Sequence, residues 1–575
     1  MRKKIIYQLI LLLIAGISTV SCSLDENLYG VASTEGFVKT EADANFVVAG
    51  VYGANQSFDS FKSSTAGLIL YSGDDFAYTS TISNNSPGVW INRAFTSSDP
   101  YVNRAWTSFY SCINRANSAI SAIDSVETIK PEVRAKINGE MTFLRGFSYF
   151  YLVRLFGGVP IRLSETKPTD NLKLPRASVD SVYAQIFRDF KNANNKCVSY
   201  KQQPASEFGR ATKGAAQAML AQAYLTYANY LDLNGKSAEA QFNYQLASNW
   251  CDSVLTSNQY ALTSNYADLW DVNKEKAAYN EVIYGIQFTR DATASAASSK
   301  GSEWAYYQQP AERWAVSGAN LPRGNGSGTT KLQPWFAEQY FSGEYTSDYR
   351  AETTILTAWN GYTNSSTNPL PRTYNCFPAI ALTPTDVVRQ SMPYCNKYTD
   401  AKGLDLRNHE NDLFIIRYAE IFLIKAEALN ELGRTSDAYP FFNELRKRAR
   451  NANGSVRTTP VDLSSGLDKE NFRLAVFNER GLELVGEGQR FFDMVRMRYP
   501  NTNTTMMQWR LETYYPNLPA TMKTLPTWDT VSKTWKGGRV YMPNVVNWDQ
   551  RFLLYPIPTT ELDANKNFGN QNSGW

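Results

Sequence analysis

The chain has 575 residues, of which 43% are hydrophobic and 19% charged, so it can bury a large core as a globular protein. Its formal net charge is +4, and three of the positive charges are Arg2, Lys3 and Lys4. A nearly neutral chain without a basic run lacks the electrostatic footprint of a nucleic-acid-binding protein, which excludes that class. Aromatic residues reach 13%, which favours an aromatic core, aromatic ligand surfaces, or both.

The chain contains one histidine, His409. A single imidazole argues against zinc sites built from several histidines and against Ser-His-Asp or Cys-His catalysis. His409 lies in the polar string RNHEND, which predicts a loop facing solvent.

The six cysteines form no CxxC pair, which argues against a zinc knuckle. If Cys22 is consumed by lipidation, an odd number of cysteines remains and at least one thiol is free. Buried single thiols are the simplest expectation. Cys376 and Cys395 lie in one loop-rich region, and the spacing leaves open whether they pair.

Residues 1–21 have the features of an export signal. A basic start is followed at 5–17 by an apolar run that is too short for a good membrane-spanning helix. Cys22 comes next and resembles the lipidated cysteine of bacterial lipoproteins, with an incidental cysteine after a plain signal peptide as the alternative. No other segment is apolar enough to span a bilayer, so we expect a lipid anchor on Cys22 and a body in water.

The first mature segments are predicted as a helix and a loop. From Thr34 to Gln56 apolar residues recur at helical spacing. Residues 70–98 are rich in Ser, Thr, Asn, Gly and Pro and predict a loop. This loop carries Asp74, Trp90 and Asn92, side chains of the kinds that build polar-ligand sites. Packing beneath a long loop is the alternative for each.

The most regular stretch, from Lys136 to Leu163, reads KINGEMTFLRGFSYFYLVRLFGGVPIRL. Phe143, Phe147 and Tyr151 are four residues apart, so they share one helix face. Physical reasoning alone predicts a buried hairpin helix in an all-α core.

The charged residues and the end of this helix can also be predicted. Arg145 and Arg154 are expected to carry their charged heads out of the apolar face while their stems pack along it. Gly157 and Gly158 accept the backbone turn that a helix end needs, and Pro160 cannot continue a helix. The helix is therefore expected to stop at Gly157.

Three further helical segments follow at 177–197, 211–231 and 238–255. They come in pairs with short breaks, at roughly the period of helix-turn-helix repeats. Residues 219–229, MLAQAYLTYAN, have the small-and-aromatic pattern of a tetratricopeptide (TPR) helix. The expected scaffold is TPR-like.

Helical periodicity fades between Asn265 and Arg407, where Gly, Ser, Asn, Thr and aromatic residues dominate. Residues 280–289 alternate in polarity and predict a strand. A loop-rich region of this length is usually functional. Flat aromatic side chains stack on sugar rings, so ligand contact is one reading of its aromatic residues and core packing the other. The candidates are Trp304, Tyr306, Tyr307 and Trp314.

Asp271, Asn273 and Glu275 place oxygen-bearing side chains at alternate positions, as calcium loops do. Lys276 stands where such a loop needs glycine for its sharp turn, so the pattern argues against calcium. We expect no cofactor.

Helical spacing returns at 413–433, 440–449 and 468–485. Opposite charges recur there at helical spacing, which suggests either catalytic groups or an ion-paired network that ties helices together. The network is the favoured interpretation because buried charges need partners. The residues concerned are Arg417, Glu420, Glu427, Glu479, Arg480, Glu483, Glu487, Arg490 and Asp493.

Five segments resemble the motifs of one family, the SusD/RagB nutrient-binding lipoproteins of Bacteroidota. Residues 136–163 resemble its E-x-x-F-L-R-A-x-x-Y-F-x-L-V-R-x-F-G-x-V-P signature, and similar matches occur at 176–190, 415–433, 478–496 and 555–575. The matches run the length of the chain in the family's order.

The resemblance implies a mainly α fold in which four TPR-like helix pairs form a scaffold and loop-rich insertions form the ligand face. The mature chain, 22–575, would then comprise a helical part at about 30–265, a ligand region at about 266–410 and a C-terminal part at about 411–575. The resemblance also implies a place on the outer face of the outer membrane, as a lid on a SusC-like TonB-dependent transporter. Calcium occurs in some family members.

The leading hypothesis is a non-enzymatic lipoprotein of the cell surface that binds an oligosaccharide or polysaccharide. Capture of peptides or another nutrient is the second. A surface glycoside hydrolase is the third, with Asp74 and Asp75 as carboxylates. Adjacent residues in a loop usually point apart, whereas hydrolysis needs two carboxylates that flank one bond, so this third hypothesis is disfavoured.

Overall fold

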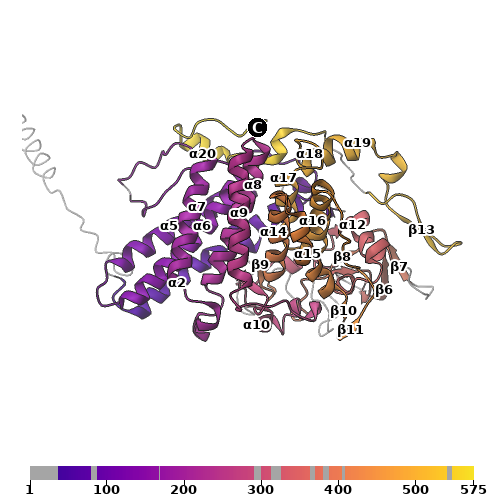
Figure 1. Ribbon diagram of the computed structural model, residues 1–575, viewed down its shortest axis with the longest axis horizontal. Helices are drawn as coiled ribbons and strands as arrows, with labels where there is room; N and C mark the ends of the chain where they lie inside the picture. The colour runs from indigo at the N-terminus through magenta and orange to yellow at the C-terminus, as the bar shows by residue number, and fades with distance from the viewer. Residues whose placement is uncertain are drawn as a thin grey trace, which may run out of the picture.

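The computed structural model describes residues 37–78, 87–167, 169–290, 300–311, 326–362, 370–379, 387–403, 408–452, 454–540 and 547–575. The predicted export signal, Cys22 and Trp314 lie outside these residues. The predicted mainly α fold is confirmed. Figure 1 shows the N-terminal helices (indigo to magenta) beside the C-terminal helices (orange), with most strands gathered at one end of the molecule.

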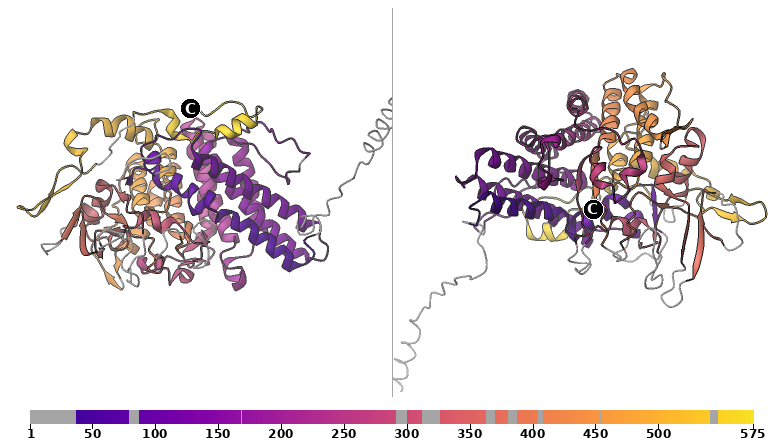
Figure 2. Two further views of the ribbon diagram at one scale, coloured as in Figure 1. Left: turned by 180° about the vertical axis from the view of Figure 1, so that it is seen from behind. Right: turned by 90° about the horizontal axis from the view of Figure 1, so that it is seen from below.

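The N-terminal part is built from long helices. Helices α5 and α6 pack together, α7 lies against both α6 and α8, and α8 packs on α9. Helix α9 in turn lies against α14 of the C-terminal part, so the two parts form one continuous array, which Figure 2 shows from behind and from below. The N-terminal helices are α2 (Glu41–Asn55), α3 (Ser64–Tyr71), α4 (Pro87–Ile91), α5 (Pro100–Asp124), α6 (Pro131–Phe156), α7 (Val179–Lys196), α8 (Lys213–Leu233) and α9 (Ser237–Leu255).

Helix α2 begins where its sequence provides a cap. The Thr40 hydroxyl accepts a hydrogen bond from the Asp43 amide, and the Asp43 carboxylate accepts one from the Thr40 amide. This reciprocal pair satisfies two amides that have no partner inside the helix. The helix predicted over 34–56 is therefore confirmed, with its first residue at Glu41.

Helix α6 is the centre of the aromatic core. Phe147 lies 4.9 Å from Tyr151 and 6.3 Å from Phe143, measured between ring centroids, and all three rings are buried. The helix starts at Pro131, five residues before the predicted stretch, and ends at Gly157, whose φ of 75° strongly favours glycine.

The arginines of α6 behave differently from each other. Arg145 reaches across to α7 and forms an ion pair with Asp189 at 2.6 Å. Arg154 was expected to carry its head into solvent, and this prediction is wrong, because the side chain is buried among aromatic rings. Phe150 and Tyr151 of α6 and Phe492 of the C-terminal part pack against its guanidinium.

The region between the two helical parts contains strands and short helices. The strand predicted over 280–289 is confirmed as β2 (Val282–Ile286), which pairs with β9 (Leu413–Arg417) and is fully buried. Strands β5, β6 and β7 form a three-stranded sheet. The other elements are α10 (Glu275–Ala278), α11 (Trp304–Gln308), β3 (Thr330–Leu332), α12 (Pro334–Glu338), α13 (Arg350–Thr354), β4 (Ile355–Leu356), β5 (Ala358–Tyr362), β6 (Pro371–Cys376), β7 (Val387–Gln390) and β8 (Tyr394–Cys395).

The described parts of the stretch 70–98 contain regular elements where its composition predicts a loop. It includes strand β1 (Phe76–Tyr78), which pairs with β3 from more than 250 residues further along the chain, and helix α4. Both elements depend on partners that are distant in sequence, so local composition does not reveal them.

The C-terminal part adds helices and then crosses the molecule. After Arg496 the chain runs along the upper edge in Figure 1, in yellow, and reaches the ends of α6 and α8. The Asn572 side-chain amide donates to the carbonyl of Phe156 at 3.1 Å, which joins the last residues to the end of α6. The elements are α14 (Tyr418–Glu431), α15 (Thr435–Ala449), β10 (Asn451–Ala452), β11 (Ser455–Val456), α16 (Lys469–Leu484), α17 (Arg490–Arg496), α18 (Met506–Trp509), α19 (Tyr515–Asn517), β12 (Thr527–Asp529), β13 (Thr534–Lys536) and α20 (Thr559–Ala564).

Two local expectations are settled by burial. His409 was predicted to face solvent, but it is fully buried, because its backbone pairs with Ser302 and Gly403 packs against its ring. The cysteines among the described residues are buried and free, as expected for single thiols, and Cys376 and Cys395 do not pair.

Candidate functional site

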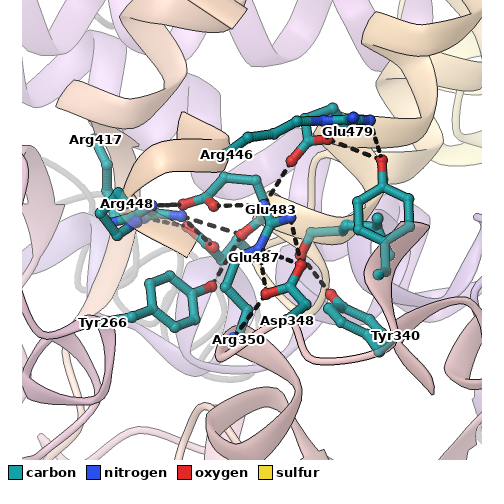
Figure 3. Close-up of polar contacts among 12 residues, drawn as sticks. Tyr266, Tyr340, Asp348, Arg350, Arg417, Arg446, Arg448, Glu479, Glu483 and Glu487 are labelled. Carbon is teal, nitrogen blue, oxygen red and sulfur yellow. Dashed lines mark hydrogen bonds and ion pairs between the residues drawn. The ribbon is translucent and has the colours of Figure 1, made fainter. Parts of the chain in front are cut away.

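The charged residues of the C-terminal motifs form an ion-paired network, shown in Figure 3. Glu483 on α16 lies at its centre and binds Arg350 and Arg417, each at 3.1 Å, as well as Arg448. These four side chains are almost fully buried. Burial alone raises the pKa of Glu483, but the three arginines outweigh it and hold that pKa well below its usual range.

The remaining charges of the motifs are paired in the same way. Arg480 bridges Glu420 at 2.9 Å and Asp493 at 2.8 Å. Arg496 pairs with Glu427 and with Asp493. The predicted network is confirmed, and because its side chains are buried and paired with one another, they offer no group to a substrate.

Asp74 belongs to this network and not to a ligand surface. Its carboxylate accepts from Arg490 at 2.7 Å and lies 3.3 Å from Arg510, and the residue is only 4% exposed. The neighbouring Asp75 is also buried, and burial together with the charge of Asp74 raises its pKa to about 7. The expectation that Asp74 contacts ligand is therefore corrected, because two arginines occupy its oxygens.

Two of the predicted ligand aromatics lie in the core. Trp90 is 2% exposed and donates its indole N–H to Asp99 at 3.3 Å. Trp304 is 1% exposed and donates to the carbonyl of Gly486 at 2.8 Å. A ring that is covered by protein has no face left for a sugar, so the packing alternative holds for both.

Asn92 is 8% exposed and thus also buried. Tyr306 and Tyr307, on α11, are half-buried and retain accessible surface. Trp314 lies outside the described residues. Of the predicted aromatic candidates, the two tyrosines are those that the structure leaves partly accessible.

A ladder of rings connects Tyr307 with the first loop. Tyr71 lies 6.0 Å from Tyr307 and 6.4 Å from Trp90, and Trp90 lies 4.6 Å from Tyr101, measured between ring centroids. The buried ring of Trp90 therefore packs against the half-buried ring of Tyr101. Candidates from both regions that the sequence analysis selected therefore come together, Trp90 from the first loop and Tyr307 from the loop-rich region after Asn265.

Further exposed groups adjoin this ladder. The guanidinium of Arg104 lies 5.5 Å from the ring of Tyr101 and 5.3 Å from that of Phe58, and its Nε is 3.5 Å from the carboxylate of Asp59. Asp59 and Arg104 remain 57% and 40% exposed. We refer to these residues together as the tyrosine surface: Phe58, Asp59, Tyr101, Arg104, Tyr306 and Tyr307.

Hydrogen bonds fix the orientation of Tyr307. Its hydroxyl lies 3.2 Å from the Ser63 hydroxyl and donates to Glu303 at 3.2 Å. Burial, Glu303 and the nearby Tyr101 phenol raise the pKa of Tyr307 well above its ordinary value, so the ring carries no charge at neutral pH. The arrangement offers neutral aromatic rings beside one cation and one anion.

This combination suits a polyhydroxylated ligand. Aromatic rings take up the apolar C–H face of a sugar, and charged groups hold hydroxyls without binding a net charge. Sequence reasoning missed Phe58, Asp59, Tyr101 and Arg104. The spacing of Tyr101 and Arg104, three residues apart at the start of a helix, was the one available signal.

The oxygen-bearing side chains predicted at 271–275 form hydrogen bonds with other groups of the protein. The carboxylate of Asp271 accepts from the amide and side chain of Asn273, both at 3.0 Å. Glu275 instead accepts from the backbone amide of Asp412 at 2.8 Å. Asp271 and Asn273 therefore bind each other while Glu275 binds a different segment, and the three side chains do not converge.

Comparisons with known proteins agree with the motifs. The model of the SusD family matches residues 280–575, and a second model, described as starch-binding and associating with outer membrane, matches residues 39–225. The SusD-like protein P2 of Formosa agariphila is 27% identical over an alignment of 573 residues, and the match covers 97% of this chain and 98% of that protein. The starch-binding protein SusD of Bacteroides thetaiotaomicron is 24% identical over an alignment of 489 residues, and the match covers 79% of this chain and 75% of that protein.

Solved structures show the same fold. A SusD homologue from Bacteroides thetaiotaomicron superposes with a TM-score of 0.76 at 22% identity and covers 94% of this chain and 98% of its own. A laminarin-binding SusD-like protein superposes with a TM-score of 0.66 at 20% identity and covers 94% of this chain and 100% of its own. With the family model matching more than half of the sequence, the chain belongs to the SusD family.

Proposed function

We propose that the protein binds an oligosaccharide or polysaccharide at the cell surface, without breaking it, and delivers it to a SusC-like TonB-dependent transporter. The observation that carries the proposal is the tyrosine surface, which combines partly exposed rings with Asp59 and Arg104. Two comparisons support the binding proposal: the second family model is described as starch-binding, and a protein of the same fold binds laminarin.

Recognition on this surface needs no bond to be made or broken. Tyr101 and Tyr306 present ring surface to the apolar faces of sugars, and Arg104 and Asp59 donate to and accept from hydroxyls. Tyr307 is oriented by Ser63 and Glu303 and extends the same platform.

The proposal includes attachment to the outer membrane through lipid on Cys22. It is supported by the sequence of residues 1–21, which has the features of an export signal and directly precedes this cysteine, and by the family description that names the outer membrane. No helix in the described ranges is both long and apolar enough to cross a bilayer. Replacing Cys22 by Ala should release the protein from membranes; a variant that still carries lipid and sediments with membranes would contradict the anchor.

The binding proposal is tested with the soluble chain 23–575 and a panel of glycans that includes laminarin and starch. Calorimetry should detect binding of one class, and the polymer should be recovered unmodified, since a released reducing end would indicate a hydrolase. Tyr101→Ala, Arg104→Ala and Tyr306→Ala should each weaken binding about tenfold or more, because each removes ring area or a charged hydrogen bond.

The matched control is Phe46→Ala, which removes a 72% exposed ring from α2, away from the tyrosine surface. It should bind glycan like the unmodified chain. If all three surface variants bind glycan with the affinity of the unmodified chain, the glycan binds at another place on the protein. Binding of peptides but of no glycan would replace the proposal with the second hypothesis.

A further inference from the structure

A cavity lies where the ends of α6 and α8 meet α17 and residues 550–554 of the C-terminal segment. In Figure 1 the ends of these helices lie near the upper edge. The volume of the cavity is about 370 Å³, and its wall combines apolar side chains with amides and hydroxyls. It shares no residue with the tyrosine surface. Its wall includes Val153, Arg154, Tyr183, Tyr230, Phe492 and Gln508.

Arg154 is the unusual member of this wall. The residue is 7% exposed, and its guanidinium carbon lies 3.9 Å from the ring centroids of Phe150 and Phe492 and 4.4 Å from that of Tyr151. Its Nε–H donates to the carbonyl of Phe150 at 3.3 Å, and its other hydrogen-bond neighbour is the Tyr151 hydroxyl. These partners are all neutral.

Among the described residues, most buried arginines form ion pairs with carboxylates; Arg93, which donates to the backbone carbonyls of Ile91 and Ser72, is an exception besides Arg154. Arg496, the second cation in the cavity wall, pairs with Glu427 and Asp493. For Arg154, no described residue provides a carboxylate within ion-pair distance, and no acidic side chain belongs to the cavity wall. The charge of Glu420 acts on Arg154 from beyond ion-pair distance, and Glu420 is itself paired with Arg480. A nearly buried guanidinium therefore borders the cavity without a carboxylate in direct contact.

This situation favours an anion as the occupant. Burying a cation costs several kcal/mol unless an opposite charge is close, and a guanidinium matches the two oxygens of a carboxylate. Stacking on three rings offsets part of that cost but supplies no negative charge. The ring surfaces of Tyr183, Tyr230 and Phe492 provide room for a compact, partly apolar body beside the charge.

We propose that this cavity binds a small carboxylate-bearing molecule, with its carboxylate at Arg154 and its body against the tyrosine and phenylalanine rings. An acidic sugar and an aromatic or aliphatic acid share this chemistry, and the experiment distinguishes them. The site is separate from the tyrosine surface, so its occupancy does not depend on glycan binding there.

The test uses the folded chain 23–575 and two matched pairs of probes: D-glucuronate with D-glucose, and 3-phenylpropionate with 3-phenylpropanol. Calorimetry should show that one acid binds at least tenfold more tightly than its neutral counterpart. The pair that shows the difference identifies the kind of body that the cavity accepts. Equal affinity for acid and neutral probe, or no binding of either acid, would overturn the proposal.

Two variants locate the bound acid. Arg154→Met keeps an unbranched apolar side chain among the rings and should abolish the preference for the acid. Leu233→Trp fills the cavity from its rim and leaves the guanidinium in place, so it should block binding even if the Arg154 variant proves unstable. Thermal unfolding checks the fold of each variant. Unchanged acid binding in a folded Arg154→Met or Leu233→Trp protein would contradict the assignment.

Discussion

At the residue scale, the charges of the C-terminal motifs are buried together with partners of opposite charge. Glu483 contacts three arginines from three different segments of the chain, and its ionised form is favoured in spite of full burial. Removing one member of such a group leaves the others uncompensated, which costs more than the pair contributes by itself.

The first prediction concerns this centre. Glu483→Gln keeps the shape of the side chain but removes its charge, so Arg350, Arg417 and Arg448 lose a shared partner. The free energy of unfolding should fall by about 3–5 kcal/mol. Chemical denaturation measures it. The control Asp437→Asn breaks an exposed pair with Arg434 and should cost about 1 kcal/mol or less, and equal losses in both variants would contradict the role of the network.

Glu140 on α6 is a buried carboxyl whose pKa is raised, whereas the pKa of Glu483 is lowered. Glu140 is 2% exposed, accepts from the Tyr52 hydroxyl at 3.0 Å, and has Arg210 at 4.0 Å. Burial raises its pKa to about 7 from an ordinary value of 4.5, although Arg210 opposes that rise. The folded protein therefore holds a proton between these two pH values that the unfolded chain releases.

The second prediction follows from this difference. Stability contributed by protonated Glu140 is present below about pH 4.5 and is lost as the pH rises through 7. Glu140→Gln removes this pH dependence. The unmodified chain should lose up to about 3 kcal/mol of unfolding free energy between pH 5 and pH 8 through Glu140, and the variant should not show this loss. Urea denaturation at both pH values measures the effect, with the exposed Glu132→Gln as the control. An unchanged pH dependence in Glu140→Gln would contradict it.

At the scale of elements, glycines decide where α6 stops and how the next segment passes it. Gly157 adopts a φ of 75° at the helix end. A Cβ on Gly158 would lie 2.2 Å from the backbone carbonyl oxygen of Ala177, the residue that leads into α7. The backbone cannot move away easily, because the amide of Ala177 donates to the carbonyl of Val159.

The third prediction compares two glycines. Gly158→Ala should lower the free energy of unfolding by about 1–3 kcal/mol or more, because the added methyl group clashes with backbone. Gly50→Ala, inside α2 with open space around it, should raise stability by about 0.5–1 kcal/mol, since alanine is the better helix former. Thermal and urea unfolding measure both changes. A stabilising Gly158→Ala would mean that the turn is looser than the structure shows.

At the scale of the whole molecule, the two helical parts share one core. A single hydrophobic cluster extends from Val48 of α2 to Phe568 near the C-terminus. The end of the chain also closes on α6, where the Asn572 side chain donates to the carbonyls of Phe156 and Tyr555, at 3.1 and 2.6 Å. The molecule is therefore expected to unfold as one unit.

The fourth prediction is that calorimetry of the chain 23–575 shows one unfolding transition. Asn572→Ala leaves two buried carbonyls with fewer partners and should destabilise this single transition by about 1–3 kcal/mol. Asn567→Ala, which affects an exposed hydrogen bond to Lys173, is the control and should have a smaller effect. Two separate transitions, of which the variant shifts only one, would contradict a shared core.

The sequence by itself determined those features that depend on local pattern. The spacing of Phe143, Phe147 and Tyr151 identified the central helix, and the glycines after it marked its end. The alternation at 280–289 identified a strand, and the opposite charges at 479–493 indicated an ion-paired network, because buried charges need partners. Each of these signals lies within a few turns of helix or one strand.

Only the tertiary structure decided which side chains are covered. Trp90 and Trp304 lie in stretches with the composition of a ligand loop, yet both are buried, and Trp304 binds the carbonyl of Gly486, which is distant in sequence. Arg154 is covered by aromatic rings that include Phe492 from the C-terminal part. The tyrosine surface joins residues near 58, 101 and 306, whose proximity follows from ring contacts across more than 200 positions. Burial and proximity depend on the path of the whole chain, and no local pattern records that path.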